Sequence, residues 1–311
     1  MISIYISGYQ LLCVIIQSMK VLVTGGGAFI GSSIASSLSK KFQISAPSSA
    51  DLYLLDTKEV HNYLKKNNFD FIIHCANHLV HPLLKESKNP EIQLINNMKM
   101  FFNLAINNEL FQKMIYFGSG AEFGRESWKV KMKESFFGEN YPQDQYGLSK
   151  YFMNVHTRLS NNIYNLRLFG MYGKKDDWRF RFIPYICAKA FLNENIIVNQ
   201  NAIFGFLYVD DLIKIVEKFM IFNPEPGDYN ISNNEDLELI KIAEIVNLLR
   251  TKKEIIINKP GIATSYSGDN SKLMKTFPDI EFTPIEVGVK EIYNFYIENP
   301  KIIDKTKFLI K

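Results

Sequence analysis

The sequence predicts an α/β fold with a doubly wound parallel sheet. A short apolar run, Lys20-Val21-Leu22-Val23-Thr24, stops at Gly25, and apolar residues then recur at helical spacing from Phe29 to Lys41. The same alternation of strand and helix continues as far as Leu168. Regular alternation of this kind implies a parallel sheet with helices on both faces, which is a Rossmann-type arrangement.

Each expected element follows from apolar periodicity between turn residues. The expected strands after the first are Phe42 to Ala46, Phe71 to Cys75, Lys113 to Phe117 and Ile163 to Leu168; the expected helices are Thr57 to Asn67, Ile92 to Asn108 and Gln145 to Leu159. After Gly173 the pattern changes to short mixed elements, among them Tyr208 to Phe222 and Glu238 to Arg250. We therefore expect a dinucleotide-binding domain over residues 19–173, rejoined by 206–222, and a smaller mixed α/β substrate lobe over 174–205 and 223–311.

The first 18 residues are apolar but contain Ser7, Gly8, Gln10 and Gln17, and they fall short of the roughly 20 residues that span a bilayer. They lack the charged start and the small-residue cleavage site of a signal peptide, and Met19 follows directly. We expect residues 1–18 to be an extension outside the fold, and no membrane attachment.

Composition excludes several classes of function. Lys+Arg 36 against Asp+Glu 32 gives a net charge of +4, and the basic residues are scattered, so no nucleic-acid surface is expected. Cys13, Cys75 and Cys187 are odd in number and far apart, which favours a reducing, cytoplasmic setting over a disulfide framework. The segment from His74 to His81 is rich in histidine, but its spacing does not fit a zinc site, and no metal is expected.

The turn from Gly25 to Gly31 lies between the first strand and the first helix, where backbone N–H groups can hold a pyrophosphate. The strand before it and the amphipathic helix after it are the context in which such a turn binds a dinucleotide. The residues expected at the cofactor are Gly25, Gly27, Ala28, Phe29, Ile30 and Gly31, with Ala28 at a place where a glycine is common.

The second strand ends in Ser45-Ala46-Pro47-Ser48-Ser49, without the acidic residue that binds the adenosine ribose of NAD. No carboxylate at this place would repel a 2′-phosphate, and Ser48 or Ser49 can donate a hydrogen bond to one. The expected cofactor is NADPH, with NAD as the alternative.

Tyr146 and Lys150 are four residues apart on an expected helix, so they share one face. A phenol alone is a poor acid or base at neutral pH, and a neighbouring ammonium favours the phenolate and brings its pKa toward the working range. This pair therefore predicts a proton-transfer site.

The strand Lys113 to Phe117 runs into Gly118-Ser119-Gly120-Ala121-Glu122-Phe123-Gly124, which places the Ser119 hydroxyl at the carboxyl end of a strand. With the glycine turn and the Tyr146/Lys150 pair, this resembles the extended short-chain dehydrogenase/reductase family of nucleotide-sugar epimerases, dehydratases and reductases, over residues 19–297. The resemblance implies a catalytic triad of Ser119, Tyr146 and Lys150, and cofactor contacts from Cys75, Ala76, Asn97 and Lys150, whose ammonium would also hold the nicotinamide ribose. It also implies a homodimer through the helices that carry Lys99 and Tyr151.

Departures from the family pattern reduce the number of reactions that are expected of this chain. The family's 4,6-dehydratases carry Thr-Asp-Glu where this chain has Ser119-Gly120-Ala121, and Glu122 comes one place too late, so dehydration is not expected. The compact second unit, Ser49 to Asp56, is similar to that of nucleotide-sugar 4-ketoreductases. The expected function is NADPH-dependent reduction of a nucleotide-linked 4-keto-6-deoxysugar for surface polysaccharides. A 4-epimerase with bound NAD and a non-catalytic dinucleotide-binding protein remain as alternatives.

The expected substrate contacts come from the resemblance. Its pattern Arg-x-x-Asn-x-Tyr-Gly reads Arg167 to Gly173 here, with Gly170 in place of the Asn, and a diphosphate-binding Arg is replaced by Phe204. Arg179 or Arg181 can supply the missing cation, as can Lys174 and Lys175. We therefore expect Arg167, Gly170, Arg179, Arg181 and Phe204 at the substrate.

Overall fold

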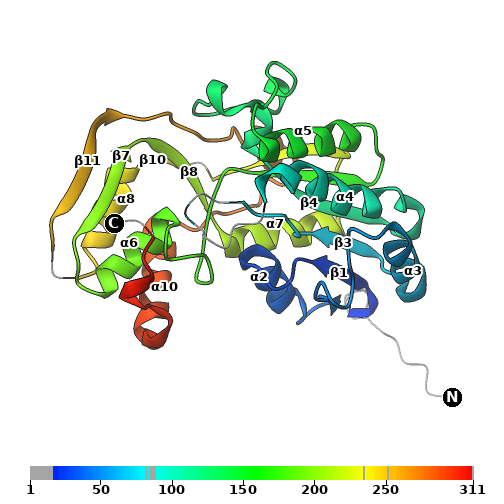
Figure 1. The fold of residues 1–311 in the computed structure, drawn as a ribbon, viewed down its shortest axis with the longest axis horizontal. Helices are drawn as coiled ribbons and strands as arrows, with labels where there is room; N and C mark the ends of the chain where they lie inside the picture. The colour runs from blue at the N-terminus through cyan, green and yellow to red at the C-terminus, as the bar shows by residue number, and fades with distance from the viewer. Residues whose placement is uncertain (1–16, 81–82, 84–88, 234, 251, 310–311) are drawn as a thin grey trace.

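The computed structural model describes residues 17–80, 83, 89–233, 235–250 and 252–309 (Figure 1). Its larger domain is built on a six-stranded sheet in the order β2-β1-β3-β4-β5-β9, in which every pairing is parallel. The strands are β1 (Lys20–Thr24), β2 (Gln43–Ser45), β3 (Phe71–His74), β4 (Lys113–Ser119), β5 (Ile163–Leu168) and β9 (Gly227–Ile231). The predicted doubly wound parallel sheet is confirmed.

Helices cover both faces of this sheet. Successive strand residues point to opposite sides, so alternate residues of one strand pack against different helices. Val21 and Val23 pack against α2 (Phe29–Leu38), α7 (Val209–Ile221) and α9 (Ser271–Thr276). Leu22, which lies between them, packs against α3 (Thr57–Asn67), α4 (Gln93–Ala105) and α5 (Gln145–Thr157) on the other face. The central strands β1, β3 and β4 are buried along most of their length, and their sequences are largely apolar runs.

Local signals explain where α3 begins and ends. The Asp56 carboxylate caps its first turn by accepting the Glu59 N–H at 2.8 Å. The helix ends at Asn68, whose φ of 51° is left-handed, a conformation that asparagine adopts more readily than most residues. Lys65 and Lys66 in the last turn complement the helix dipole, and the predicted bounds of this helix are confirmed.

The smaller lobe contains two further sheets and three helices. The first sheet has the order β10-β8-β6 and the second pairs β11 with β7. Their bounds are β6 (Gly170–Tyr172), β7 (Ile196–Asn201), β8 (Ile203–Tyr208), β10 (Asp236–Glu238) and β11 (Ile255–Ile262). The helices α6 (Phe182–Phe191), α8 (Leu239–Asn247) and α10 (Ile285–Glu298) enclose a separate apolar core with them.

Short 3-10 turns complete the described chain, at Pro90–Ile92, Asn108–Leu110, Gly120–Phe123, Arg125–Ser127, Glu134–Phe136, Pro300–Ile302 and Lys305–Lys307. Among the described residues, no helix is both long enough and apolar enough to cross a bilayer. The expectation for residues 1–18 falls almost wholly outside the described chain, which includes only the last two of them.

The division of the chain between the two parts differs from the expectation in at least two segments. Residues 227–231 were assigned to the lobe, but β9 pairs in parallel with β5 at the edge of the main sheet. Leu273 and Phe277, after β11, also pack in the core of the larger domain. The chain therefore crosses between the two parts more often than its local pattern indicates, because apolar periodicity identifies a strand but not the sheet that it joins.

Candidate active site

The glycine turn lies at the carboxyl end of β1, and its backbone is close to the end of β3. Gly25 has a φ of 68°, and a Cβ atom there would lie 2.6 Å from the backbone nitrogen of Ala76. A Cβ at Gly31 would lie 2.3 Å from the Gly25 carbonyl oxygen, so both glycines are required for α2 to begin this close to the strand. A Cβ at Gly27, by contrast, would meet no atom within 4 Å.

This open side of the turn fits a dinucleotide pyrophosphate. Gly27 and Ala28 are exposed, and Ala28 is the N-cap of α2, where N–H groups are available to an anion. Phe29 and Ile30 contribute at most their backbone N–H groups, because the Ile30 side chain packs against the core and the Phe29 ring lies beside Gly173.

Cys75 and Ala76 form a wall beside the glycine turn, and Asn97 on α4 contacts the same segment at His78. The Ala76 N–H donates to Thr24 Oγ1 at 3.3 Å, and the Cys75 N–H donates to the Thr24 carbonyl oxygen at 3.2 Å. Asn97 is buried, and its Oδ1 accepts the His78 N–H at 2.6 Å. Its Nδ2 has no hydrogen-bond partner among the described residues, as expected of a donor that serves a ligand.

The loop after β2 also borders the turn, since a Cβ at Gly26 would lie 2.8 Å from the Cβ of Ala46. The Ser48 hydroxyl in this loop donates to Asp51 Oδ2 at 2.6 Å, so it is already used within the protein. The exposed Asp51 carboxylate thus lies where the sequence analysis expected no carboxylate. Asp51 is three residues past Ser48 in the sequence, and only the folded loop brings its carboxylate to the Ser48 hydroxyl. Ser49 is exposed.

Tyr146 and Lys150 lie on one face of α5, as predicted. The helix begins at Asp144, whose carboxylate caps the Gly147 N–H at 2.9 Å. The Lys150 ammonium donates to the Phe117 carbonyl oxygen at 2.8 Å and lies 5.8 Å from the centre of the Tyr146 ring. Burial lowers the pKa of Lys150 to about 8, while the nearby Glu122 carboxylate opposes that change.

Ser119 ends β4 and faces the Tyr146 phenol. Burial raises the pKa of Tyr146, which is opposite to the lowering expected from the sequence, while the hydrogen bond with the Ser119 side chain lowers it. Gly147 allows this approach, because a Cβ there would lie 2.7 Å from the Ala121 carbonyl oxygen. The fold thus brings the three residues of the expected triad together at the carboxyl edge of the sheet.

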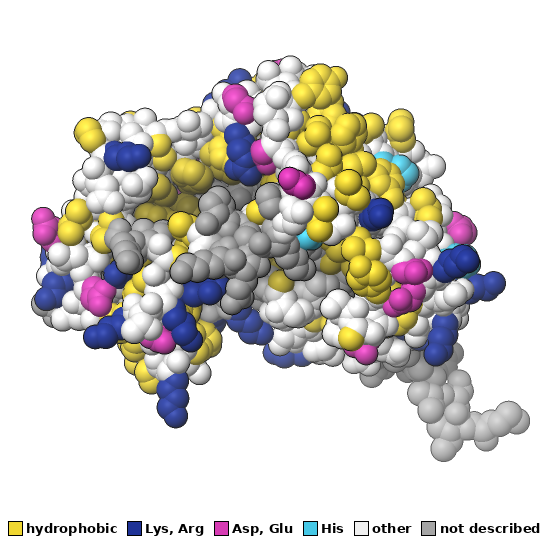
Figure 2. Space-filling model, in the orientation of Figure 1, with side chains coloured by type: hydrophobic (Ala, Val, Ile, Leu, Met, Phe, Trp, Pro, Cys, Tyr) yellow, Lys and Arg dark blue, Asp and Glu magenta, His cyan; other side chains and the backbone are white. Residues whose placement is uncertain are grey.

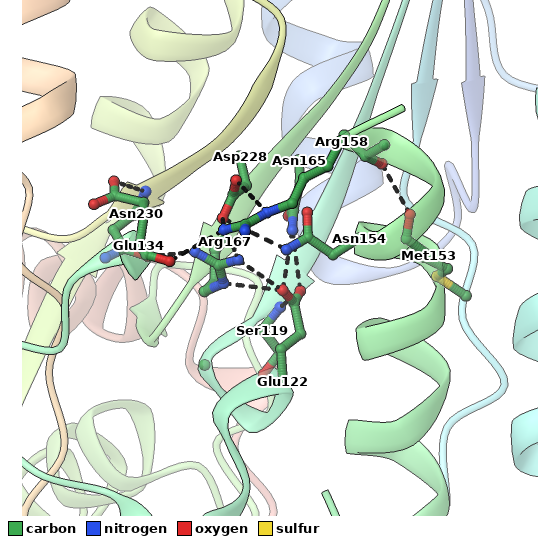
Figure 3. Close-up of polar contacts among 12 residues, drawn as sticks. Ser119, Glu122, Glu134, Met153, Asn154, Arg158, Asn165, Arg167, Asp228 and Asn230 are labelled. Carbon is green, nitrogen blue, oxygen red and sulfur yellow. Dashed lines mark hydrogen bonds and ion pairs between the residues drawn. The ribbon is translucent and has the colours of Figure 1, made fainter. Parts of the chain in front are cut away.

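Arg167 does not lie at the substrate, which corrects the expectation. Its side chain projects from β5 and is fully buried among polar partners (Figure 3). Its Nε donates to Glu122 Oε2 at 2.9 Å and its Nη2 donates to Asp228 Oδ2 at 2.6 Å. Its Nη1 donates to Asn230 Oδ1 at 2.8 Å. With every nitrogen of the guanidinium bound inside the protein, Arg167 is structural.

Gly170 and Phe204 lie where the lobe meets the site. A Cβ at Gly170 would lie 2.8 Å from the Gly205 carbonyl oxygen, so the close pairing of β6 with β8 leaves no room for a side chain there. The partly exposed Phe204 ring stacks on Phe206 at 5.7 Å and lies 5.9 Å from the Tyr266 ring. An apolar surface therefore stands where the resemblance implies an arginine.

The two arginines among the candidate replacement cations differ in their surroundings. Arg179 donates from Nη2 to Asp177 Oδ2 at 2.6 Å and from Nε to Asp177 Oδ1 at 2.9 Å, so its charge is already paired. Arg181 is exposed at the N-terminus of α6, and its charge lowers the pKa of Tyr146. Of these two, Arg181 has the better position for a substrate anion.

The sequence analysis missed Tyr266 as a member of this site. A Cβ at Gly120 would lie 2.2 Å from the Tyr266 hydroxyl, which places that hydroxyl next to Ser119. The ring is buried and stacks on Trp128 at 3.9 Å, and the Trp128 Nε1–H donates to the Gly120 carbonyl oxygen at 3.0 Å. Tyr266 lies 147 positions after Ser119, so no local signal could pair them.

Comparison with known proteins agrees with this geometry. The model of the NAD dependent epimerase/dehydratase family matches residues 21–232, and the chain belongs to that family. The chain is 25% identical to the GDP-L-colitose synthase of Yersinia pseudotuberculosis, over 73% of this chain and 81% of the relative. It is 23% identical to the dTDP-4-dehydro-6-deoxyglucose reductase of Escherichia coli, over 86% of this chain and 93% of the relative.

Solved structures share the fold. A GDP-L-fucose synthetase from Naegleria fowleri bound to NADP superposes with a TM-score of 0.80 at 18% identity, covering 92% of this chain and 94% of that chain. The UDP-glucose 4-epimerase of Thermotoga maritima with UDP-glucose superposes with a TM-score of 0.75 at 15% identity, covering 91% of this chain and 100% of that chain. The chain is thus a member of a family of nucleotide-sugar-modifying enzymes that use a nicotinamide dinucleotide.

Proposed function

We propose that the protein reduces the 4-keto group of a nucleotide-linked 4-keto-6-deoxysugar, with NADPH as the reductant, in the synthesis of surface-polysaccharide sugars. The observation that carries this proposal is the convergence of Ser119, Tyr146 and Lys150 at the sheet edge, while Glu122, the acid next to Ser119, is fully buried. A phenol and an ammonium beside a serine hydroxyl, with the neighbouring Glu122 carboxylate buried, fit ketone reduction better than elimination of water.

Proton transfer by the chain's own residues completes this reaction. When bound, NADPH would supply a hydride to the ketone carbon, and the negative charge that grows on the carbonyl oxygen would require a proton. The Tyr146 phenol donates that proton, and its raised pKa keeps it protonated at neutral pH. The Ser119 hydroxyl donates a hydrogen bond to the same oxygen, and the Lys150 ammonium stabilises the phenolate that forms.

The choice of NADPH rests on two observations, and a third opposes it. The second strand ends without a carboxylate, and a structural neighbour of the chain carries NADP. Against this, the exposed Asp51 carboxylate lies in the same loop and would repel a 2′-phosphate placed close to it. NADPH therefore stays the proposed cofactor, with NAD as the alternative.

A 4-epimerase with tightly held NAD is the second candidate, favoured by the similarity to a UDP-glucose 4-epimerase. Incubation of purified protein with NADPH and a panel of nucleotide-linked 4-keto sugars distinguishes the two. Loss of NADPH absorbance with formation of one new sugar supports reduction. Interconversion of two 4-hydroxy sugars without net cofactor oxidation supports epimerisation. Cofactor binding with neither reaction supports a non-catalytic protein.

A homodimer through α4 and α5 is proposed as the working form. Side chains exposed on and just after these helices include Ile95 (51% exposed), Phe152 (42%) and Leu159 (82%), with Lys99 beside them. Figure 2 shows hydrophobic side chains gathered over these helices. Covering them with a second copy would bury this apolar surface. Sedimentation of wild type against Phe152→Glu tests this, since a wild-type monomer would contradict it.

The free thiols of the described chain, Cys75 and Cys187, accord with the proposed cytoplasmic location. Cys187 is buried in the lobe core and Cys75 borders the glycine turn, so neither forms a disulfide in the described structure.

A further inference from the structure

Glu122 is a fully buried carboxylate directly beneath Ser119. Its Oε1 accepts the backbone N–H of Ser119 at 3.0 Å, while the Ser119 hydroxyl accepts the Ala121 N–H at 3.2 Å. The two residues thus cap the 3-10 turn Gly120–Phe123 reciprocally. The backbone that carries the Ser119 hydroxyl is therefore fixed by the Glu122 side chain.

The Glu122 carboxylate is in turn held from the next strand. Asn165 Nδ2 donates to its two oxygens at 3.2 and 3.1 Å, and Arg167 Nε donates to Oε2 at 2.9 Å (Figure 3). Both partners project from β5 and are fully buried. A buried ion pair is weak evidence for stability, because the desolvation of two charges offsets their attraction. The contact of this ion pair with the Ser119 backbone therefore points to a role in the active site.

We propose that Glu122, anchored by Arg167, is a positioning residue that sets the orientation of Ser119 against Tyr146. The proposal rests on the proposed function, since it assigns Glu122 a part in the same proton transfer. Arg167 thereby has a role that the family pattern did not indicate, as the support of the catalytic serine.

The effect on Lys150 comes from the sign of the Glu122 charge. Groups from several elements influence the ammonium of Lys150. Glu122 lies after β4, and Cys75 and His74 lie at the end of β3. The ring of Tyr116 on β4 and the ring of Tyr146 on α5 also lie near the ammonium. A carboxylate favours the charged form of Lys150 and so opposes its deprotonation. Removal of the Glu122 charge should let Lys150 lose its proton at lower pH.

Two substitutions of Glu122 both weaken its hold on Ser119, and only one of them removes the charge. The amide N–H₂ of a glutamine would face the Asn165 and Arg167 donors. Glu122→Gln removes the charge, and Glu122→Asp keeps the charge but shortens the side chain by one methylene, away from the Ser119 N–H. We expect kcat to fall about tenfold in both, with KM and the NADPH dissociation constant within about twofold of wild type. The alkaline limb of the kcat–pH profile should move to lower pH in Glu122→Gln only.

Asp211→Asn is the matched control. Asp211 is also a buried carboxylate that accepts a backbone N–H, from Thr283 at 2.7 Å, and it pairs with Lys214 at 2.8 Å, outside the site. This variant should lose thermal stability while its kcat and pH limb stay those of wild type. If the Glu122 variants, like Asp211→Asn, keep the kcat and the alkaline limb of the kcat–pH profile of wild type, the proposal is overturned.

A measurement without substrate separates this proposal from the proposed function. Hydrogen exchange of the Ser119 amide in the NADPH-bound protein should accelerate in Glu122→Gln and in Glu122→Asp but not in Asp211→Asn. If no keto sugar is turned over by wild type, the proposed function fails. Unchanged exchange of the Ser119 amide in both Glu122 variants, by contrast, shows that Glu122 does not hold Ser119 and overturns the positioning role itself.

Discussion

Lys150 donates a hydrogen bond of 2.8 Å from its Nζ to the Phe117 carbonyl oxygen, which ties α5 to β4 two residues before Ser119. This single bond links the helix that carries the phenol with the strand that carries the serine hydroxyl. It also fixes the ammonium 5.8 Å from the Tyr146 ring centre. The relative placement of the proposed acid and its partners is therefore a property of the fold rather than of flexible side chains.

Replacement of Tyr146 by Phe should abolish proton donation and leave the fold intact. We expect kcat for keto-sugar reduction to fall by about a thousandfold, in line with the usual contribution of a general acid. NADPH affinity, measured by fluorescence titration, should stay within about twofold of wild type, because the ring is retained.

Tyr296→Phe is the control for that change. Its hydroxyl is buried in the lobe and has no hydrogen-bond partner among the described residues, so its removal should leave kcat unchanged. Equal loss of activity in both variants would argue against a special role for Tyr146.

Turnover should fall as pH rises through the pKa of Lys150, which burial lowers to about 8. Below that value the ammonium is present and stabilises the forming Tyr146 phenolate; above it the charge and its effect are lost. The Tyr146 phenol has a raised pKa and stays protonated throughout this window. A kcat–pH profile that stays flat to pH 10 would contradict this assignment. Lys150→Met, measured in parallel, should show low activity and no fall in kcat as pH rises through about 8.

Asp51→Asn should improve the use of NADPH relative to NADH. The Asp51 carboxylate is exposed and faces Ser48 in the loop after β2, and removal of its charge reduces repulsion of a 2′-phosphate. We expect the ratio of kcat/KM values for the two cofactors to rise about threefold at low salt and less at high salt. A ratio that does not change would place the 2′-hydroxyl end of the cofactor away from this loop.

Gly170→Ala should destabilise the protein, because its methyl group would lie 2.8 Å from the Gly205 carbonyl oxygen and from the Phe206 ring. We expect a loss of about 1–3 kcal/mol in the free energy of unfolding, measured by chemical denaturation. Gly27→Ala is the matched change, since a methyl group there meets no atom within 4 Å. It should leave stability unchanged and weaken NADPH binding, as it fills the space assigned to the pyrophosphate.

The sequence was sufficient for the features that depend on local order. The strands at Lys20 and Ile163, the helix at Thr57, the glycine turn and the Tyr146/Lys150 face all follow from periodicity and spacing within a few residues. Ser119 could be placed because the carboxyl ends of parallel strands meet at one edge.

The residues that were misplaced or missed depend on long-range contacts. Arg167 was expected at the substrate because its motif resembles a family pattern, yet its ion pairs with Glu122 and Asp228 join segments 45 and 61 residues away. Tyr266 reaches Ser119 only because the segment after β11 returns to the site. No periodicity within one element contains that information.

The stoichiometry of the reaction is the most direct test of the proposed function. Purified protein, a nucleotide-linked 4-keto-6-deoxysugar and NADPH are mixed, cofactor oxidation is followed by absorbance, and the product is identified by NMR. The proposal predicts roughly one NADPH oxidised for each keto sugar converted to a 4-hydroxy sugar, because each ketone accepts a single hydride. Conversion of one 4-hydroxy sugar into its 4-epimer with no net loss of NADPH would contradict it.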